Sequence, residues 1–316
     1  MNLTLLGAAG EVTGSSFLAR TRQASVLVDF GLFQGSTQVT NGNVVPAALK
    51  VEDLDAVVIT HAHLDHTGRL PLLARRGYKR PIYATPASIE FTKLILEDAA
   101  KIQEQDAERD NRKRAEKGKP PIPPIFTAAD VAAVLELFRP LPYGLPVEIA
   151  PGVSMRMFEA GHILGSASIE MTLEDSGVRH VVVFSADIGP PNAPMRRDAE
   201  CLTRADVVLM ASTYVDRDNR SLADTVAEFR RIVVEAVARK GKIFVPTFAV
   251  GRAQQLLYHL SGMFEDKIVE PFPIVLDSPM AIEATHLYEQ HRELYDEEML
   301  ERSAKGEFRR NMAYLR

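Results

Sequence analysis

The sequence contains little cysteine, no long apolar run and no excess of positive charge, and each of these absences excludes a class of protein. Cys201 is the one cysteine among 316 residues, which excludes an intramolecular disulfide framework and fits a reducing cytoplasm. No uncharged stretch approaches the roughly 18 apolar residues that a membrane-spanning helix needs. The N-terminus also lacks the charged start of a secretion signal. We therefore expect a cytoplasmic protein with no membrane partner.

The charge balance leaves nucleic-acid binding open. The net charge is −5 at pH 7, so the chain lacks the overall basic character that indicates a nucleic-acid binder. A nuclease can still be acidic overall, because bound metals and a local basic groove receive the phosphates. The hydrophobic fraction of 46% is that of a globular protein with a core large enough for one or two domains.

Histidine is scarce but concentrated in one place. Three of the eight histidines, His61, His63 and His66, lie within six positions together with Asp65. Imidazole and carboxylate are the ligands that suit zinc and other borderline divalent metals. The cluster follows the apolar run 54–60, so His61 and His63 point the same way if the strand continues. Asp65 and His66 lie past the bend and can face a second metal.

Short apolar runs separated by turn residues predict a first part built mainly from strands. The predicted helices are 68–75 and 86–116, and residues 120–124 form an extended connector. Consecutive strands with few helices between them predict a sheet packed on a second sheet. From residue 97 the long helix mixes both charge signs densely, which is typical of a solvated surface rather than a binding patch. Strands are predicted at 3–6, 25–28, 56–60, 81–84, 153–158, 167–173 and 180–185.

From about residue 205 the pattern changes to alternating strands and helices. This order is typical of a parallel, doubly wound layer. The predicted elements are a strand at 207–210, a helix at 221–240, a strand at 242–246, a helix at 252–264 and a strand at 274–276.

Three further polar residues stand at the ends of predicted strands. His162 lies between two glycines after a strand, and Asp187 and Asp29 each end an apolar strand. Any one of them is more typical of a turn than of a functional site. Their recurrence at strand ends, which converge on one rim of a sheet sandwich, favours a shared site with the histidine cluster.

With these residues in place, the chain resembles the metallo-β-lactamase superfamily through its His-x-His-x-Asp-His signature at 61–66. Within that superfamily it resembles the β-CASP group of RNA-processing nucleases, relatives of the cleavage and polyadenylation endonuclease. The subgroup is indicated by the blocks at 5–15, 29–35, 160–167, 245–254 and 276–281. The resemblance implies a metallo-β-lactamase αββα sandwich over residues 1–208, followed by an incomplete Rossmann-like β-CASP domain over 209–316.

The resemblance also implies roles for the candidate residues. His61, His63 and His162 would hold one zinc, Asp65 and His66 the second, and Asp187 would bridge them. Asp29 would orient a ligand histidine, so Asp29, Asp65 and Asp187 are the expected catalytic carboxylates. Two metals would generate a hydroxide near neutral pH and clamp an RNA phosphodiester during in-line displacement. Arg252 and Ser278 are the candidate phosphate contacts. Single-stranded RNA is the expected partner, and a homodimer is left open.

The chain departs from the family pattern in two places. The family's Glu-Ser-Thr-Tyr-Gly motif reads Ala211-Ser212-Thr213-Tyr214-Val215, and Asn219 stands where many members have histidine. Family members also continue to later histidines that serve catalysis and complete the second zinc, whereas no histidine follows His291. The expected consequences are an incomplete protein shell for the second zinc, unpaired strand edges and exposed apolar surface.

Three hypotheses follow. The first is a zinc-dependent ribonuclease of the β-CASP type. The second is a catalytically impaired homologue that binds RNA or a partner protein, favoured by Ala211 and the missing histidines. The third is a hydrolase of small esters or thioesters on the same fold, against which the subgroup blocks argue.

Overall fold

The computed structural model describes residues 1–36, 40–213, 216, 218, 220–305 and 315. The chain divides into two compact units. Unit 1 comprises Met1–Ala160, Gly165–Ile188 and Glu200–Ala211, and unit 2 comprises Gly161–Leu164, Gly189–Ala199 and Ser212–Arg316. The predicted domain boundary at 208/209 stays a prediction.

The first sheet of unit 1 has six strands in chain order, from β1 to β6. Strands β1 to β3 pair antiparallel, and β3 to β6 pair parallel. The parallel arrangement brings the carboxyl ends of β3, β4 and β5 to one edge. The strands are β1 (Asn2–Gly7), β2 (Ser16–Arg20), β3 (Ser25–Val28), β4 (Ala56–Val58), β5 (Ile82–Ala84) and β6 (Phe138–Pro140).

The second sheet of unit 1 has the order β11-β10-β9-β8-β7. Strands β7 to β10 form an antiparallel meander, and β11 pairs parallel to β10. The strands are β7 (Val147–Ala150), β8 (Val153–Glu159), β9 (Ala167–Asp175), β10 (Val178–Phe184) and β11 (Val207–Leu209).

Alternation of side chains along the strands gives the first sheet two buried faces. Val26 and Val58 face the second sheet and pack with residues such as Met171 and Phe184. Leu27 and Val57, their chain neighbours, belong to the core under the helices. This period of two explains why these strands read as continuous apolar runs.

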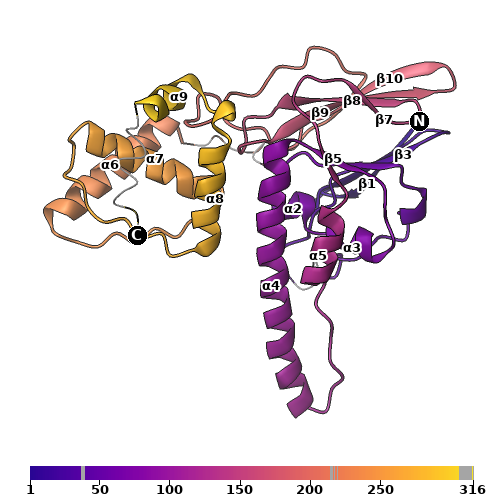
Figure 1. Ribbon diagram of the computed structural model, residues 1–316, viewed down its shortest axis with the longest axis horizontal. Helices are drawn as coiled ribbons and strands as arrows, with labels where there is room; N and C mark the ends of the chain where they lie inside the picture. Colours follow the sequence, from indigo (N-terminus) through magenta and orange to yellow (C-terminus); the bar gives the residue numbers. More distant parts are fainter. Residues whose placement is uncertain (37–39, 214–215, 217, 219, 306–314, 316) are drawn as a thin grey trace. The chain divides into compact units, whose positions relative to one another are not determined.

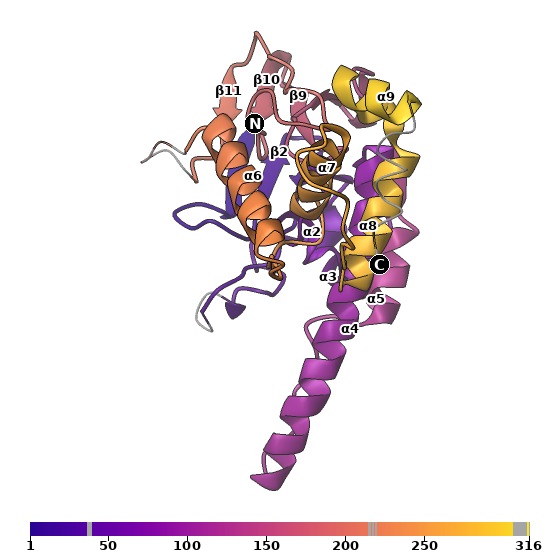
Figure 2. The ribbon, with the colours of Figure 1, turned by 90° about the vertical axis from the view of Figure 1, so that its left-hand side faces the viewer.

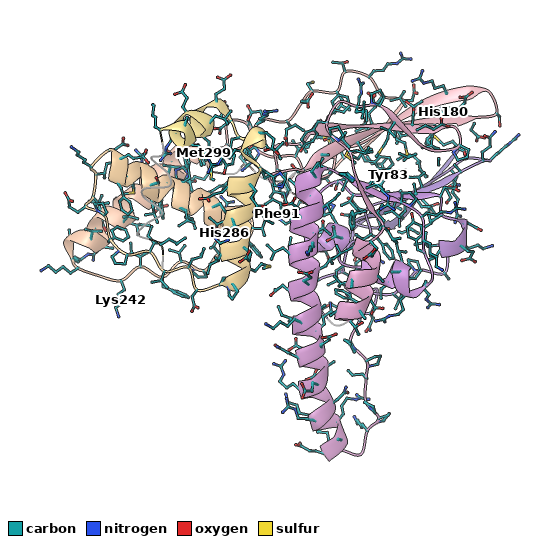
Figure 3. The ribbon with its side chains drawn as sticks, in the orientation of Figure 1. Tyr83, Phe91, His180, Lys242, His286 and Met299 are labelled. Atoms are coloured by element: carbon teal, nitrogen blue, oxygen red, sulfur yellow. The ribbon has the colours of Figure 1, made fainter. Side chains whose placement is uncertain are left out.

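Helices cover the outer face of the first sheet (Figure 1). They are α2 (Leu64–Thr67), α3 (Leu70–Arg75), α4 (Pro86–Glu116) and α5 (Ala128–Leu135), with a 3-10 turn at Val51–Asp53. The start of α4 packs on the sheet, and Phe91 there is fully buried (Figure 3). The prediction of a helix at 86–116 is confirmed. The predicted helix at 68–75 is present as α3, which begins at Leu70, and the short helix α2 precedes it and ends before Gly68.

Unit 2 is helical in its described part. Its helices are α6 (Leu222–Ala238), α7 (Arg252–Glu265), α8 (Pro279–Gln290) and α9 (Glu297–Ala304), with a 3-10 turn at Arg292–Leu294. Helices α6, α8 and α9 are each preceded by an N-cap residue whose side chain accepts a backbone hydrogen bond; these are Ser221, Ser278 and Asp296.

The predicted strands of unit 2 are wrong in the described residues. Residues 242–246, which begin at the labelled Lys242 in Figure 3, form no strand, and Ile274 makes an isolated bridge to Leu315. Local β-propensity is not enough, because a strand is stabilised by a partner strand and a covered face. The side chains of Phe244 and Phe248 are instead 90% and 83% exposed.

No helix among the described residues is long and apolar enough to cross a membrane.

Candidate metal centre

The predicted site residues lie just past the carboxyl ends of four strands. Asp29 directly follows β3, whereas His61, His162 and Asp187 each lie three residues after β4, β8 and β10. At this edge Asp29 N donates to Val58 O at 2.9 Å within the first sheet, and Ala167 N of the second sheet donates to Thr60 O at 2.8 Å and so joins the two sheets. The convergence of strand ends that the sequence predicts is therefore present.

The Asp29 segment supports the histidine loop through its backbone. Phe30 N donates to His66 O at 2.8 Å and Leu32 N to Leu64 O at 2.9 Å, so residues 30–32 run alongside 64–66. Gly31 lies between these two bonds, and a Cβ there would come within 1.5 Å of the Asp65 carbonyl oxygen. Only glycine permits this approach, which is the physical reason for the glycine in the 29–35 block.

Asp29 is the buried anchor of the centre. One of its oxygens lies 2.7 Å from Nδ1 of His66 and accepts a 2.8 Å hydrogen bond from the hydroxyl of Thr60. The other accepts the Thr60 amide at 2.8 Å. This contact leaves Nε2 of His66 directed away from Asp29, which is the geometry that the predicted orienting role requires. The role itself stays a prediction.

Among the described residues, one group of side chains has the geometry of a metal site. His61, His63, His162 and Asp187 each offer one ligand atom, and these atoms lie within 4.8 Å of one another. Nε2 of His61 and Nδ1 of His63 are 3.1 Å apart. A tetrahedral zinc with Zn–N bonds of 2.0–2.1 Å separates two ligand nitrogens by about 3.3 Å. The donor set and its spacing therefore fit a divalent metal such as zinc.

Asp187 also approaches the residues predicted for the second metal. Nε2 of His66 lies 3.8 Å from an Asp187 oxygen and 3.9 Å from an Asp65 oxygen. Asp187 thus touches both groups, as a bridging carboxylate would. The side chain of Asp187 is 36% exposed and that of Asp65 is 23% exposed, whereas His61 and His66 are buried. The two carboxylates are therefore partly open to solvent, whereas His61 and His66 form the buried side of the centre.

The charges in the centre hold one proton tightly in the absence of metal. Burial opposes the charged form of His66, but Asp29, Asp65 and Asp187 outweigh it and raise the pKa of His66 to about 9. Burial raises the pKa of Asp65, assisted by Asp187 and opposed by His66. A metal at Nε2 of His66 must displace this proton, so binding there releases a proton.

Arg69 ties the surrounding loops together. Its guanidinium is fully buried and donates to the carbonyl oxygens of Gly31, Gly14 (3.2 Å), Val44 (3.4 Å) and Gly42 (3.5 Å). It also stacks on two aromatic rings, Phe30 at 4.3 Å and Phe33 at 4.5 Å. Burial lowers its pKa to about 10, opposed by Glu11, so it remains charged at neutral pH.

Sequence reasoning missed three residues around the centre. Thr60 bonds to Asp29 and lies 3.1 Å from Nδ1 of His61, and Ser15 Oγ lies 3.4 Å from Nε2 of His66. Arg69 is the third. Thr60 could have been found in the sequence from its position between the apolar strand and His61. Arg69 could have been found as the charged residue of an otherwise uncharged turn.

The departure at Ala211 lies beside the metal-facing carboxylate. The Ala211 amide donates to Ser185 Oγ at 3.2 Å, and Ser185 is two residues before Asp187. Alanine brings no carboxylate to this position. Val215 and Asn219 lie outside the described residues.

The two candidate phosphate contacts are at helix starts in unit 2. Arg252 is exposed at the first residue of α7 and donates to Gln255 at 3.2 Å. Ser278 caps α8, where its hydroxyl accepts the Ala281 amide at 3.2 Å. Capping α8 is a sufficient structural role for Ser278. The contacts of Arg252 and Ser278 with RNA stay predictions.

Comparison with known proteins places this chain in a family. The profile of the metallo-beta-lactamase superfamily matches residues 9–239, and that of the Beta-Casp domain matches residues 253–315. Ribonuclease TTHA0252 of Thermus thermophilus is 36% identical over 95% of this chain and 63% of its own length. Transcription termination factor FttA of Methanococcus maripaludis is 31% identical over 95% of this chain and 45% of its own length.

A solved structure shares the fold. The protein of unknown function from Enterococcus faecalis V583 has a TM-score of 0.51 at 14% identity, over 91% of this chain and 67% of its own. The chain spans less than two thirds of the length of the two curated relatives named above. The family matches and the mixed α/β fold confirm the predicted resemblance and fold class. The chain belongs to the metallo-beta-lactamase superfamily and contains a Beta-Casp domain.

Proposed function

We propose that the protein is a zinc-dependent ribonuclease that hydrolyses RNA phosphodiester bonds at the His61–Asp187 centre. The observation that carries the proposal is the group of three histidines and Asp187 with ligand atoms within 4.8 Å. The named relatives, a ribonuclease and a transcription termination factor, support RNA as the substrate.

The chain's own residues would prepare the centre for this reaction. His61, His63, His162 and Asp187 would hold one metal, with Asp187, Asp65 and His66 holding the second. Bound zinc supplies a water whose pKa lies near 7 and neutralises charge on the phosphoryl oxygens. Asp29 and Thr60 fix the ring of His66 and so direct its Nε2 toward the centre. The partly exposed Asp187 and Asp65 would face the side from which a substrate approaches.

A second function is favoured by one observation. Ala211, where the family has glutamate, donates its amide to Ser185 close to Asp187 but offers no acid to the network. A metal-binding but catalytically impaired protein that retains RNA binding is therefore the alternative.

One experiment separates the two. The purified protein is assayed for zinc per protomer and for cleavage of an end-labelled single-stranded RNA, beside an Asp187→Ala variant. The ribonuclease predicts bound zinc and cleavage that the variant loses. Bound zinc with RNA binding but no cleavage supports the impaired homologue, and absence of bound metal contradicts both.

A further inference from the structure

The second half of α4 is an arm that extends past the rest of unit 1. Buried residues of this helix end at Ala100, and residues 101–116 continue for about four more turns, roughly 24 Å. Figures 1 and 2 both show this half of the helix standing clear of the sheets and of α5. Residues 117–125 return along it. The arm, residues 101–125, is therefore accessible on most of its surface.

Hydrogen bonds connect the helical part of the arm to the segment that returns along it. Asn111 accepts the Ile122 amide at 2.7 Å and donates to the Ile122 carbonyl at 2.8 Å. Arg114 donates to the Pro120 carbonyl at 2.7 Å, and Glu104 accepts the Ala128 amide at 3.0 Å. A helical extension of this length is marginal by itself in water. These bonds to the proline-rich return segment hold it in place.

Charge on α4 is segregated along its length. Residues 97–108 contain five acidic side chains and one basic, a net charge of −4. Residues 109–119, the tip, contain six basic and two acidic side chains, a net charge of +4. Because the whole chain carries −5, all residues outside the tip carry −9. A solvated helix of mixed charge has no need of this separation.

Part of the positive charge at the tip is unpaired. Arg109 and Arg112 form ion pairs with Asp106 and Glu108 at 2.9 and 3.8 Å. In the described residues, the exposed Lys113, Lys117 and Lys119 have no acidic partner within ion-pair distance. The helix dipole favours basic residues in the last turn, which accounts for Lys113. It does not account for Lys117 and Lys119, which lie beyond the helix.

The opposite end of α4 is anchored beside the candidate metal centre. The hydroxyls of Thr85 and Ser88 donate to the Gly165 carbonyl at 2.6 and 2.7 Å, and Gly165 ends the loop that contains His162. The 31 residues of α4 span about 46 Å. At about 3.4 Å per stacked nucleotide, this distance corresponds to roughly 14 nucleotides.

We infer that the basic tip of the arm, residues 109–119, is a second contact for RNA, engaging the phosphate backbone of substrates long enough to extend from the metal centre. The inference rests on the proposed ribonuclease function for the choice of RNA over another polyanion. The contact would depend on charge and not on base sequence, since exposed lysine ammonium groups meet phosphates as point charges.

The test varies both the length of the RNA and the charge of the tip. The variant is Lys113→Glu/Lys117→Glu/Lys119→Glu, which leaves Asn111 and Arg114 to brace the arm. The matched control, Lys50→Glu/Lys79→Glu/Lys93→Glu, changes net charge equally at exposed lysines elsewhere in unit 1. Binding of RNAs of about 30 and about 8 nucleotides, longer and shorter than the span of α4, is measured in the Asp187→Ala background. Cleavage of both RNAs is measured with Asp187 intact.

The tip variant is expected to weaken binding of the long RNA at least tenfold, and to lower its salt slope by about 2, since each lost phosphate contact contributes about 0.7. It should raise KM for the long RNA without changing kcat, and leave the short RNA unaffected. The control variant should match the wild type. Equal losses for both lengths, equal losses in the control, or no loss would overturn the inference.

Two further outcomes separate the alternatives. Binding of polyglutamate is measured as well. If the tip variant loses polyglutamate binding but keeps RNA binding, the tip is a docking element for an acidic protein and the inference is overturned. Tip-dependent RNA binding without cleavage by the wild type would refute the ribonuclease and leave the RNA contact standing. Cleavage that requires Asp187 but is the same in the wild type and the tip variant, for both RNA lengths, would support the ribonuclease and refute the RNA contact at the tip.

Discussion

At the scale of single residues, the candidate centre depends on a few buried groups that hold exposed ones in position. Asp29 is 1% exposed and contacts both His66 and Thr60, and Arg69 joins four loop carbonyls. Both residues are buried. Their effect on chemistry is expected through the placement of the ligands.

Replacement of Asp29 by asparagine is expected to weaken zinc binding by about 10- to 100-fold, because the amide no longer fixes the His66 ring as a carboxylate does. Competition with a chromogenic chelator measures this change. Asp55→Asn is the control, since Asp55 accepts the Ser25 amide at 2.9 Å away from the histidines. Unchanged zinc affinity in Asp29→Asn, with wild-type circular dichroism, would show that the contact does not orient a ligand.

Replacement of Ala211 by glutamate tests the position beside Ser185 and Asp187. If the missing acid limits catalysis, Ala211→Glu should raise kcat/KM on RNA about tenfold, or ~1.4 kcal/mol of transition-state stabilisation. Ala211→Gln has the same shape without the charge and should give little gain. An equal gain in both variants would refute an electrostatic role for the acid.

At the scale of elements, short helices of unit 1 are stabilised by caps that the local sequence encodes. Helix α5 begins with a capping box in which Thr127 accepts the Asp130 amide at 3.3 Å and Asp130 accepts the Thr127 amide at 2.8 Å. Asp130 also pairs with Arg75 at the end of α3. Because Val131 and Val134 of α5 belong to the core, this cap helps to position a buried face.

Asp130→Asn is expected to destabilise the protein by about 0.5–1 kcal/mol at pH 7, because asparagine loses the ion pair with Arg75 and weakens the reciprocal half of the capping box. The Arg75 hydrogen bond lowers the pKa of Asp130 to about 2. A depressed folded-state pKa gives stability that is present above the model value of 3.8 and lost as pH falls through about 2.

Urea unfolding at several pH values measures this effect. The difference between wild type and Asp130→Asn should shrink between pH 4 and 2, if both remain folded there. Asp110→Asn, on the exposed half of α4, serves as control and should show no such trend. A pH-independent difference would exclude the charge of Asp130 as its source.

At the scale of the whole molecule, a metal would join segments that are distant in the chain. His61, His162 and Asp187 come from three different strand ends, so a bound ion would add cross-links that the apo protein lacks. Zinc at about 100 times its Kd should stabilise the fold by about 2.7 kcal/mol.

Thermal unfolding with added zinc and after chelation tests this expectation. The Tm should rise by several degrees with zinc and fall back with chelator, and His61→Ala and Asp187→Ala should lose the response. An equal zinc response in these variants would place the stabilising ion elsewhere.

The sequence by itself determined the family, the α4 helix and most strands of unit 1, because apolar periodicity and the His-x-His-x-Asp-His signature are local. It also identified His61, His162 and Asp187 as belonging together, although His61 precedes the other two by more than a hundred residues.

Only the tertiary structure decided the features that depend on contacts between distant segments of the chain. It left residues 242–246 without a strand, placed Thr60 and Arg69 at the centre, and left the charged second half of α4 exposed beyond the sheets. Hydrogen-bond partners, burial and the position of an exposed helix end are set by packing between distant segments, and no local pattern encodes them.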